Sequence, residues 1–411
     1  MAQQPDPAAP PPEVHTVLGA LRSPRVLRCE LLAGLVVALA LVPEAISFAV
    51  IVGVDPRVGL FTSVTMALSI AVLGGRRAMI SSATGAVAFV VAPVMAAHGL
   101  DYLLATVLLG GAVQVVLGLA GVARLMRHVP PAVVTGFVNS LAALLLLAQL
   151  PHVVGVPWVV YPLVVAGLAL IVLAPRVTRL VPSPLVAIAV LTALVVLGGL
   201  DVPDVGDEGA LPDGLPSLVL PDVPPTWETL RIVAPYAVGL ALVGLLETLV
   251  TADLVDAATR TGSDKRREAW GQGGANLVTG LFGGMGGCAV IGQSMMNTRL
   301  AHARTRLSTF SAGAFLLVLV VALGPEVAAI PMAALVAVML VVAWRSADVD
   351  SLRPSTLRRA PLGHTATMLS TLAAVVLTHN LLVGLVVGVL VAGVVAAPAR
   401  LRDVLSRRRG R

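Results

Sequence analysis

An acidic residue inside a long apolar run is the first feature that could do chemistry. Glu247 lies in the segment GLALVGLLETLVTADLV, and Thr251 follows one helical turn later on the same face. An ionised carboxylate at the centre of a bilayer costs at least about 2.5 kcal/mol, which makes an intramembrane acid a candidate for function. We expect Glu247 to hold a coupling proton or a sodium ion, with Thr251 orienting it. The alternative is a neutral glutamic acid that only joins two helices.

Two glycine pairs precede the other candidate residues. Gly74-Gly75 leads into RRAMISSATGAVAFVV, and Gly283-Gly284 leads into MGGCAVIGQSMMNTRL. A helix from Thr84 to His98 would be only about 22 Å long, too short to cross a membrane alone. Each segment therefore predicts an extended stretch that becomes a helix at membrane depth. Bare backbone at that depth must pair with other protein or line a polar cavity, and the two stretches could pair with each other.

Two helix starts that face each other can bind an anion without a buried Lys or Arg. The unpaired N–H groups and the helix dipole supply about half a positive charge at each start. Alignment on the glycine pairs places Thr84-Gly85 opposite Gln293-Ser294, at the two expected starts. Thr84 is suited to capping one helix, and Gln293 or Ser294 to lining the other. The alternative is that these small residues only permit close helix packing.

The first half of the chain has its own acid at mid-span, in LVPEAISFA. Because Pro43 kinks a helix, Glu44 and Ser47 are expected to border the same cavity, with or without contact to a substrate. Asp253 and Asp256 lie nearer the end of the Glu247 segment. We expect them to pair with Arg260 or Lys265, the nearby cations of the next loop.

Composition and charge place these residues in a membrane. The chain is 57% hydrophobic and 12% charged, with a mean hydropathy of +0.94. Apolar runs predict fourteen spans. They cover approximately residues 30–53, 58–74, 78–98, 101–122, 132–150, 157–174, 184–200, 230–258, 270–284, 287–299, 308–324, 327–344, 364–378 and 381–398.

The loops between these spans alternate in charge. All Lys and Arg except Arg57 and Arg231 fall in alternate loops or tails, as the positive-inside rule requires if both termini are cytoplasmic. The net charge of +6 then reflects loops near anionic lipid and does not indicate a nucleic-acid partner. We expect an integral protein of the plasma (inner) membrane.

The predicted fold class is an all-α polytopic membrane protein with a 7+7 inverted repeat, in which spans 3 and 10 are discontinuous and carry short strands. Its parts follow in order along the chain. They are a cytoplasmic tail 1–29 (with 1–14 disordered), a first repeat 30–200, an extracellular loop 201–229, a second repeat 230–398 and a basic cytoplasmic tail 399–411.

Metal and enzyme chemistry have little support. Cys29 and Cys288 are the only cysteines, and packing is the simplest interpretation of both. The histidines are scattered, and motifs such as GxSxG or HExxH are missing. We expect no metal, no catalysis and no cofactor beyond a coupling proton or sodium ion.

Several motifs together resemble the SulP family of anion transporters, which includes sulfate permeases and bicarbonate and dicarboxylate transporters. They include LVPEAISFAVIVGVDPRVGL, AMISSATG, MRHVPPAVVTGFVNS and LFGGMGGCAVIGQSMMN, in the family's order, and the resemblance runs from about residue 30 to 398. It implies a homodimer and an elevator-like movement of a core domain against a gate domain.

The resemblance also implies site residues. The family's substrate site corresponds to Thr84 and Gly85 and to Ala289, Val290 and Ile291. Glu247 and Thr251 match the acid and hydroxyl that hold sodium in the bicarbonate branch.

Three departures accompany the resemblance. That branch has Asp where this chain has Glu247, and a hydroxyl where it has Ile291, which favours a proton over sodium. Ser294 stands where the basic exchangers carry a cation. The chain also stops before the STAS domain that members usually carry, and a separate polypeptide could supply it.

The sequence therefore predicts a secondary active transporter of a small inorganic oxyanion, sulfate or bicarbonate. A dicarboxylate transporter, a nucleobase-proton symporter of the same architecture and an anion channel stay open as alternatives.

Overall fold

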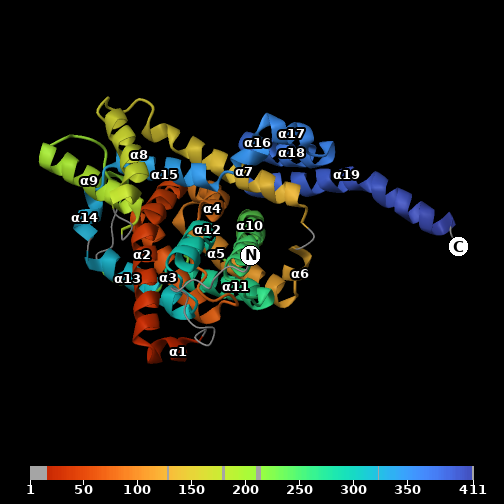
Figure 1. Cartoon of the computed structure of the whole chain (residues 1–411), viewed down its shortest axis with the longest axis horizontal. Coiled ribbons are helices and arrows are strands. Elements are labelled where there is room, and N and C mark those ends of the chain that lie inside the picture. The colour runs from red at the N-terminus through yellow and green to blue at the C-terminus, as the bar shows by residue number, and fades with distance from the viewer. Residues whose placement is uncertain (1–15, 127–128, 178–180, 210–213, 323, 410–411) are drawn as a thin grey trace, which may run out of the picture. The chain divides into compact units, whose positions relative to one another are not determined.

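The computed structural model describes residues 16–126, 129–177, 181–209, 214–322 and 324–409, and these are mostly helical (Figure 1). The predicted disordered stretch 1–14 lies outside this range, as do the last two residues of the predicted basic tail. The chain packs into two compact units: unit 1 takes residues up to 124 and 155–338, and unit 2 takes 125–154 and 339–411. Each unit thus draws on both halves of the chain.

Unit 1 contains both chain breaks. Its elements from the first half are α1 (Val17–Arg22), α2 (Pro24–Val52), α3 (Pro56–Leu73), β1 (Ser81–Ser82), α4 (Gly85–His98), α5 (Leu100–Leu119), the start of α6 (Ala123–Met126), α8 (Val160–Val177) and α9 (Ser183–Gly198). Those from the second half are η2 (Val205–Glu208), α10 (Trp227–Thr259), α11 (Lys265–Leu281), β2 (Cys288–Ala289), α12 (Ile291–Met295), the π-helical turn η3 (Met296–Leu300), α13 (Arg306–Ala322), α14 (Gly324–Ala328) and the start of α15 (Met332–Ser346).

Unit 2 is a smaller helical group. It comprises the end of α6, α7 (Pro131–Ala148), η1 (Leu150–His152), the rest of α15, α16 (Val349–Leu352), α17 (Pro354–Arg359), α18 (Leu362–Thr378) and α19 (Leu381–Arg409). Within it, Gly136 on α7 lies against the backbone of Met368 and the side chain of Thr371 on α18. The glycine thereby lets the two helices approach closely.

The helix limits follow from local chemistry. Pro24, Pro56 and Pro131 occupy the first position of α2, α3 and α7, where the missing N–H has no partner to lose. The helices α2 and α9 end at Gly53 and Gly199, both in the left-handed conformation that glycine adopts without strain. These proline and glycine residues therefore mark where each of these helices begins or ends.

Each predicted span overlaps one or more helices in the described part of the chain. Among the described residues, six helices are long and apolar enough to cross a membrane, and six shorter apolar helices accompany them. The helix α2 begins at Pro24 and so takes in the end of the predicted tail 1–29, and α1 precedes it. Two further helices, α16 and α17, occupy a predicted loop.

The predicted span 327–344 is interrupted near its start. The segment is divided into α14 and α15 by Ala329–Pro331, which pairs with the predicted outer loop. Val205 N donates to Ile330 O at 2.9 Å, and Met332 N donates to Pro203 O at 2.9 Å. Pro331 has no N–H for a helix, so these bonds hold the backbone extended.

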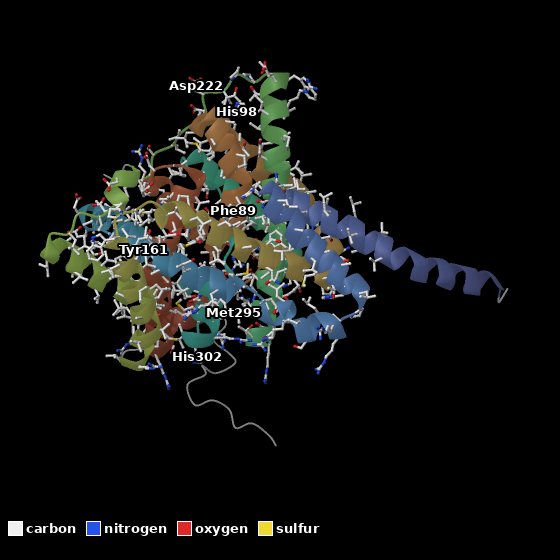
Figure 2. The ribbon with its side chains drawn as sticks, turned by 90° about the horizontal axis from the view of Figure 1, so that it is seen from above. Phe89, His98, Tyr161, Asp222, Met295 and His302 are labelled. Carbon is white, nitrogen blue, oxygen red and sulfur yellow. The ribbon has the colours of Figure 1, made fainter. Side chains whose placement is uncertain are left out.

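The predicted membrane sides of three loops can be compared within unit 1. Figure 2 shows His98 and Asp222, from predicted outer segments, at one end of unit 1, and His302, from a predicted inner loop, at the other. Phe89 and Met295 lie between them. This arrangement agrees with the predicted alternation of loops, whereas which end faces the cytoplasm stays a prediction.

The helices α2, α3, α12 and α13 lie close together around the break (Figure 1). On the other side α5 packs along α10 and α11. Gly111 on α5 and Gly273 on α11 meet with little room for a side chain, because a Cβ on Gly273 would lie 2.6 Å from Gly111 O. The two breaks are therefore enclosed by protein on several sides.

Candidate functional site

The two broken segments pair as a two-stranded antiparallel sheet, β1 with β2. Ser81 is opposite Ala289, and Ser82 is opposite Cys288. Val290 N adds a bond of 2.9 Å to Ile80 O. This confirms the prediction that the extended stretches from the two halves satisfy one another.

Side chains from neighbouring helices satisfy the rest of the first break. Ser63 on α3 accepts from Ala83 N at 3.3 Å, and Thr309 on α13 donates to Met79 O at 3.1 Å. Ser294 Oγ lies 3.0 Å from Ile80 N and 3.3 Å from Ile80 O, and so contacts both groups of one residue. Polar partners of this kind are what non-helical backbone needs inside a membrane.

A stripe of polar side chains on α11 supports the second break. Glu268, Gln272, Asn276 and Thr279 are all fully buried, at a spacing that places them on one helix face. Asn276 exchanges bonds with Gly287 N and O, at 2.9 and 3.0 Å, and Gln272 adds a bond of 3.3 Å to the same carbonyl. The predicted ninth span is thus a polar helix that fixes β2, which counting apolar residues does not show.

The same stripe ties α11 to the first break. Glu268 Oε2 accepts from Gly75 N and Arg76 N, both at 2.7 Å. Ser81 Oγ donates to Gln272 Oε1 at 3.0 Å. Both breaks therefore depend on one helix.

Thr84 begins α4 as predicted. Its backbone is extended, with φ −137° and ψ 149°, and its hydroxyl accepts from Val87 N at 3.4 Å. Thr84 O receives the first helical bond, from Ala88 N at 2.9 Å. The N–H groups of Gly85 and Ala86 belong to the first turn, which has no partners within the helix.

The second helix begins earlier than predicted. Val290 is the N-cap of α12, and Ser294 N donates to Val290 O at 3.1 Å, so the start lies at Ile291 and not at Gln293-Ser294. The extended part after Gly284 is shorter than the one after Gly75, and an alignment on the glycine pairs cannot correct for this. The positions that the family resemblance indicated, Ala289 to Ile291, coincide with the end of β2 and the start of α12.

Glu247 is joined to Thr84 through Cys288. Cys288 Sγ donates to Glu247 Oε2 at 2.9 Å and lies 3.0 Å from Thr84 Oγ1. The interpretation of Cys288 as a packing residue alone is therefore wrong, although its side chain is fully buried. Thr251 does not contact the carboxylate in this way, because its hydroxyl donates to the backbone carbonyl of Glu247 at 2.7 Å.

Glu44 is brought to the other helix start. Gln293 Nε2 donates to Glu44 Oε1, which joins α2 to α12. Gln293 Oε1 is buried with no hydrogen-bond partner among the residues that the structure describes. Ser47 turns back to its own helix, where its hydroxyl donates to Pro43 O at 2.8 Å. Of the first-half pair, only Glu44 thus bonds to the second half.

Charged residues gather where the first break leaves α3. Lys265 pairs with Asp253 at 2.9 Å and with Asp256 at 2.8 Å, which confirms the predicted pairing for that lysine. Arg76 is 7% exposed, and its Nε lies 3.0 Å from Asp256. Burial lowers the pKa of Arg76, and the Asp256 carboxylate opposes that shift.

A cavity of about 300 Å³ opens beside this charged group. It is lined by Gly75–Ala78, Thr259, Thr261–Asp264, Ala303 and Arg304. Its lining includes neither Thr84 nor Glu247 nor Gln293. It is therefore separate from the predicted site at the helix starts.

The comparisons with known proteins agree with this geometry. A family model described as the sulfate permease family matches residues 27–162 and 158–358. The chain belongs to the sulfate permease family. It is 50% identical over 368 residues to "Putative sulfate transporter YbaR" of Bacillus subtilis (strain 168), covering 90% of this chain and 76% of that protein. The predicted family is thereby confirmed.

Bicarbonate transporters are also among the relatives. The chain is 28% identical over 406 residues to "Bicarbonate transporter BicA" of Picosynechococcus sp. (strain ATCC 27264 / PCC 7002 / PR-6), covering 90% of this chain and 70% of that protein. The solved transmembrane domain of a cyanobacterium bicarbonate transporter BicA matches with a TM-score of 0.76 and 26% identity, over 88% of this chain and 97% of that one. The chain is therefore a helical membrane protein with the fold of that domain.

Proposed function

We propose that this member of the sulfate permease family is a secondary active transporter of a small inorganic oxyanion, with sulfate as its first substrate. The observation that carries the proposal is the β1–β2 pair, which joins the starts of α4 and α12 in one buried sheet. Two helix starts offer unpaired N–H donors to a negative charge. The 50% identity to a protein named for sulfate supports sulfate over bicarbonate, the substrate of the more distant relatives.

The anion would bind between the two helix starts. Thr84 and Gly85 would contribute from α4, and Ala289, Val290 and Ile291 from the end of β2 and the first turn of α12. Rotation of the Gln293 amide would let Nε2 donate to the anion instead of to Glu44. Ser294 and Ser47 would border the anion while their hydroxyls hold backbone groups.

Glu247 would carry the coupling proton. It contacts Cys288 on β2, and Cys288 contacts Thr84, so the acid is two hydrogen bonds from the α4 start. Thr251 lies one turn from this acid, and its hydroxyl bonds to the backbone carbonyl of Glu247. A sodium ion held at Glu247 is the alternative that the experiment must separate.

The wider arrangement follows from the same proposal. We place both termini on the cytoplasmic side of the plasma membrane, with fourteen spans in a 7+7 inverted repeat and a homodimer as the working assembly. The division into two units, each drawing on both halves of the chain, supports an elevator movement of one unit against the other.

Uptake into vesicles tests the proposed function. The purified protein in liposomes should accumulate labelled sulfate when a proton gradient is imposed, and much less with a sodium gradient alone. Bicarbonate should compete, and succinate and uracil should not. Saturation and counterflow would indicate a carrier, whereas flux without counterflow would indicate a channel and contradict the proposal.

A further inference from the structure

The hydroxyl hydrogen of Thr84 can serve only one acceptor. Val87 N donates to Thr84 Oγ1 at 3.4 Å and uses one of its lone pairs. Cys288 Sγ lies 3.0 Å away on another side, and either atom can donate in that contact. A hydroxyl carries one hydrogen, so Thr84 can donate to the sulfur or to a bound anion, but not to both.

The thiol of Cys288 has the same restriction. Its sulfur lies 2.9 Å from Glu247 Oε2 and 3.0 Å from Thr84 Oγ1. An ionised carboxylate only accepts hydrogen bonds, so the thiol hydrogen must point to Glu247 while that residue is charged. The sulfur is then left as an acceptor, and it takes the hydrogen of Thr84.

A proton on Glu247 allows the opposite direction. The carboxyl group then has its own O–H and can donate to the sulfur. The thiol then turns its hydrogen toward Thr84 Oγ1 and donates to the second lone pair of that oxygen. The Thr84 hydroxyl no longer donates to the sulfur, so its hydrogen is available to an anion at the start of α4. The proton that arrives on Glu247 forms an O–H bond there and later leaves from the same carboxyl group, whereas the thiol and the Thr84 hydroxyl only change the direction of their hydrogens.

We propose that Cys288 is a positioning residue that links proton occupancy of Glu247 to the hydrogen-bond donor that Thr84 offers the anion. The inference rests on the proposed function and adds the physical link between its two sites. The protein then presents its full donor set to an anion only while Glu247 is protonated. Proton and anion would consequently cross together.

The ionisable groups around this link come from α10 and from the elements packed on it. The carboxylate of Glu247 receives its bond from Cys288, the ionisable residue of β2. In the described elements packed on α10, the other ionisable side chains lie in the end turns of α4, α5 and α11 and in η3, namely His98, Asp101, Tyr102, Lys265–Glu268 and Arg299. On α10 itself, Asp253 and Asp256 are engaged with Lys265.

Substitutions of the two cysteines give a matched transport test. In liposomes with labelled sulfate, Cys288→Ala should lower accumulation driven by a proton gradient by about tenfold, the factor for one lost hydrogen bond of ordinary strength. Counterflow without a gradient should stay within about threefold, less than that same factor. Cys288→Ser keeps a donor and an acceptor and should retain coupling. Cys29→Ala is the control, since Cys29 Sγ bonds to Ala301 O elsewhere.

The outcomes separate this inference from the proposed function. Undiminished accumulation in Cys288→Ala, or equal loss of accumulation and counterflow in both Cys288 variants, would overturn the link. If Glu247→Gln still accumulates sulfate on a proton gradient, the proposed coupling fails instead.

An infrared measurement tests the link without transport. In a Cys29→Ala background Cys288 carries the only thiol of the chain, so its S–H stretching band can be followed in the purified protein. The thiol donates to the carboxylate while Glu247 is charged and to the neutral Thr84 hydroxyl once Glu247 is protonated. A neutral hydroxyl is a weaker acceptor than a carboxylate, so the band should move to higher frequency as Glu247 is protonated. The shift should vanish in Glu247→Gln. A band that does not respond to pH in the Cys29→Ala protein would overturn the proposal.

Discussion

Gln293 on α12 donates a hydrogen bond to the Glu44 carboxylate on α2. The bond connects the first-half acid to the first turn of the second-half broken helix. Each partner is thus positioned by the other, and the amide of Gln293 lies in the first turn of α12. The pair consequently joins the proposed substrate site to the packing of α2 against α12.

A double-mutant cycle on this pair should show strong coupling. Gln293→Ala removes the donor and should lower kcat/KM for sulfate uptake by about tenfold, because a hydrogen bond to a charged group is worth about 1.5 kcal/mol or more. Glu44→Ala removes the same bond, so the double variant should be no worse than the poorer single variant. The interaction energy should exceed about 0.5 kcal/mol. Additive losses would mean that the two residues act independently.

Glu247→Gln should abolish accumulation of sulfate on a proton gradient while the protein stays folded. The amide cannot take up a coupling proton, yet it can still accept a hydrogen bond from Cys288. Uptake into liposomes measures the first effect, and size-exclusion chromatography measures the second. Asp253→Asn is the matched control: it makes the same acid-to-amide change on the same helix, at a side chain 76% exposed and paired with Lys265. Equal accumulation in the Glu247 and Asp253 variants would remove Glu247 from the mechanism.

The sequence alone predicts the features of the break that depend on local chemistry. Thr84 is an N-cap because a hydroxyl precedes an apolar helical run. The strands pair because extended backbone at that depth needs hydrogen-bond partners within the protein. The start of α12 was misplaced because it depends on a bond from Val290 to Ile80, between segments far apart in the sequence.

Two other features were missed for different reasons. The spacing of Glu268, Gln272, Asn276 and Thr279 is visible in the sequence as a polar helical stripe, but a search for apolar spans passes over it. Cys288 was assigned to packing because a single thiol has no motif. Its role depends on Glu247 and Thr84, which only the fold brings to it.

Ser294→Ala should destabilise the protein more than Ser47→Ala. Loss of the Ser294 hydroxyl leaves Ile80 N without its partner in a buried site, which costs about 1–3 kcal/mol. The Ser47 hydroxyl only supplements a carbonyl of its own helix, so its removal should cost less than about 0.5 kcal/mol. The midpoint of thermal unfolding of the two purified variants in detergent gives the comparison. Equal midpoints would show that the break does not need the Ser294 bond.

Gly287→Ala should disrupt the strand pair, whereas Gly292→Ala should not. A Cβ at Gly287 would lie 2.0 Å from Ser82 O, a backbone atom of the opposite strand that cannot move without breaking the β1–β2 pairing. We expect a cost of about 3 kcal/mol or more, seen as a lower thermal midpoint or as loss of monodisperse protein. A Cβ at Gly292, in the first turn of α12, meets nothing within 4 Å, so the same substitution there should change stability by less than about 0.5 kcal/mol. A stable Gly287→Ala protein that still transports sulfate would show that the close pairing of the two breaks is not required.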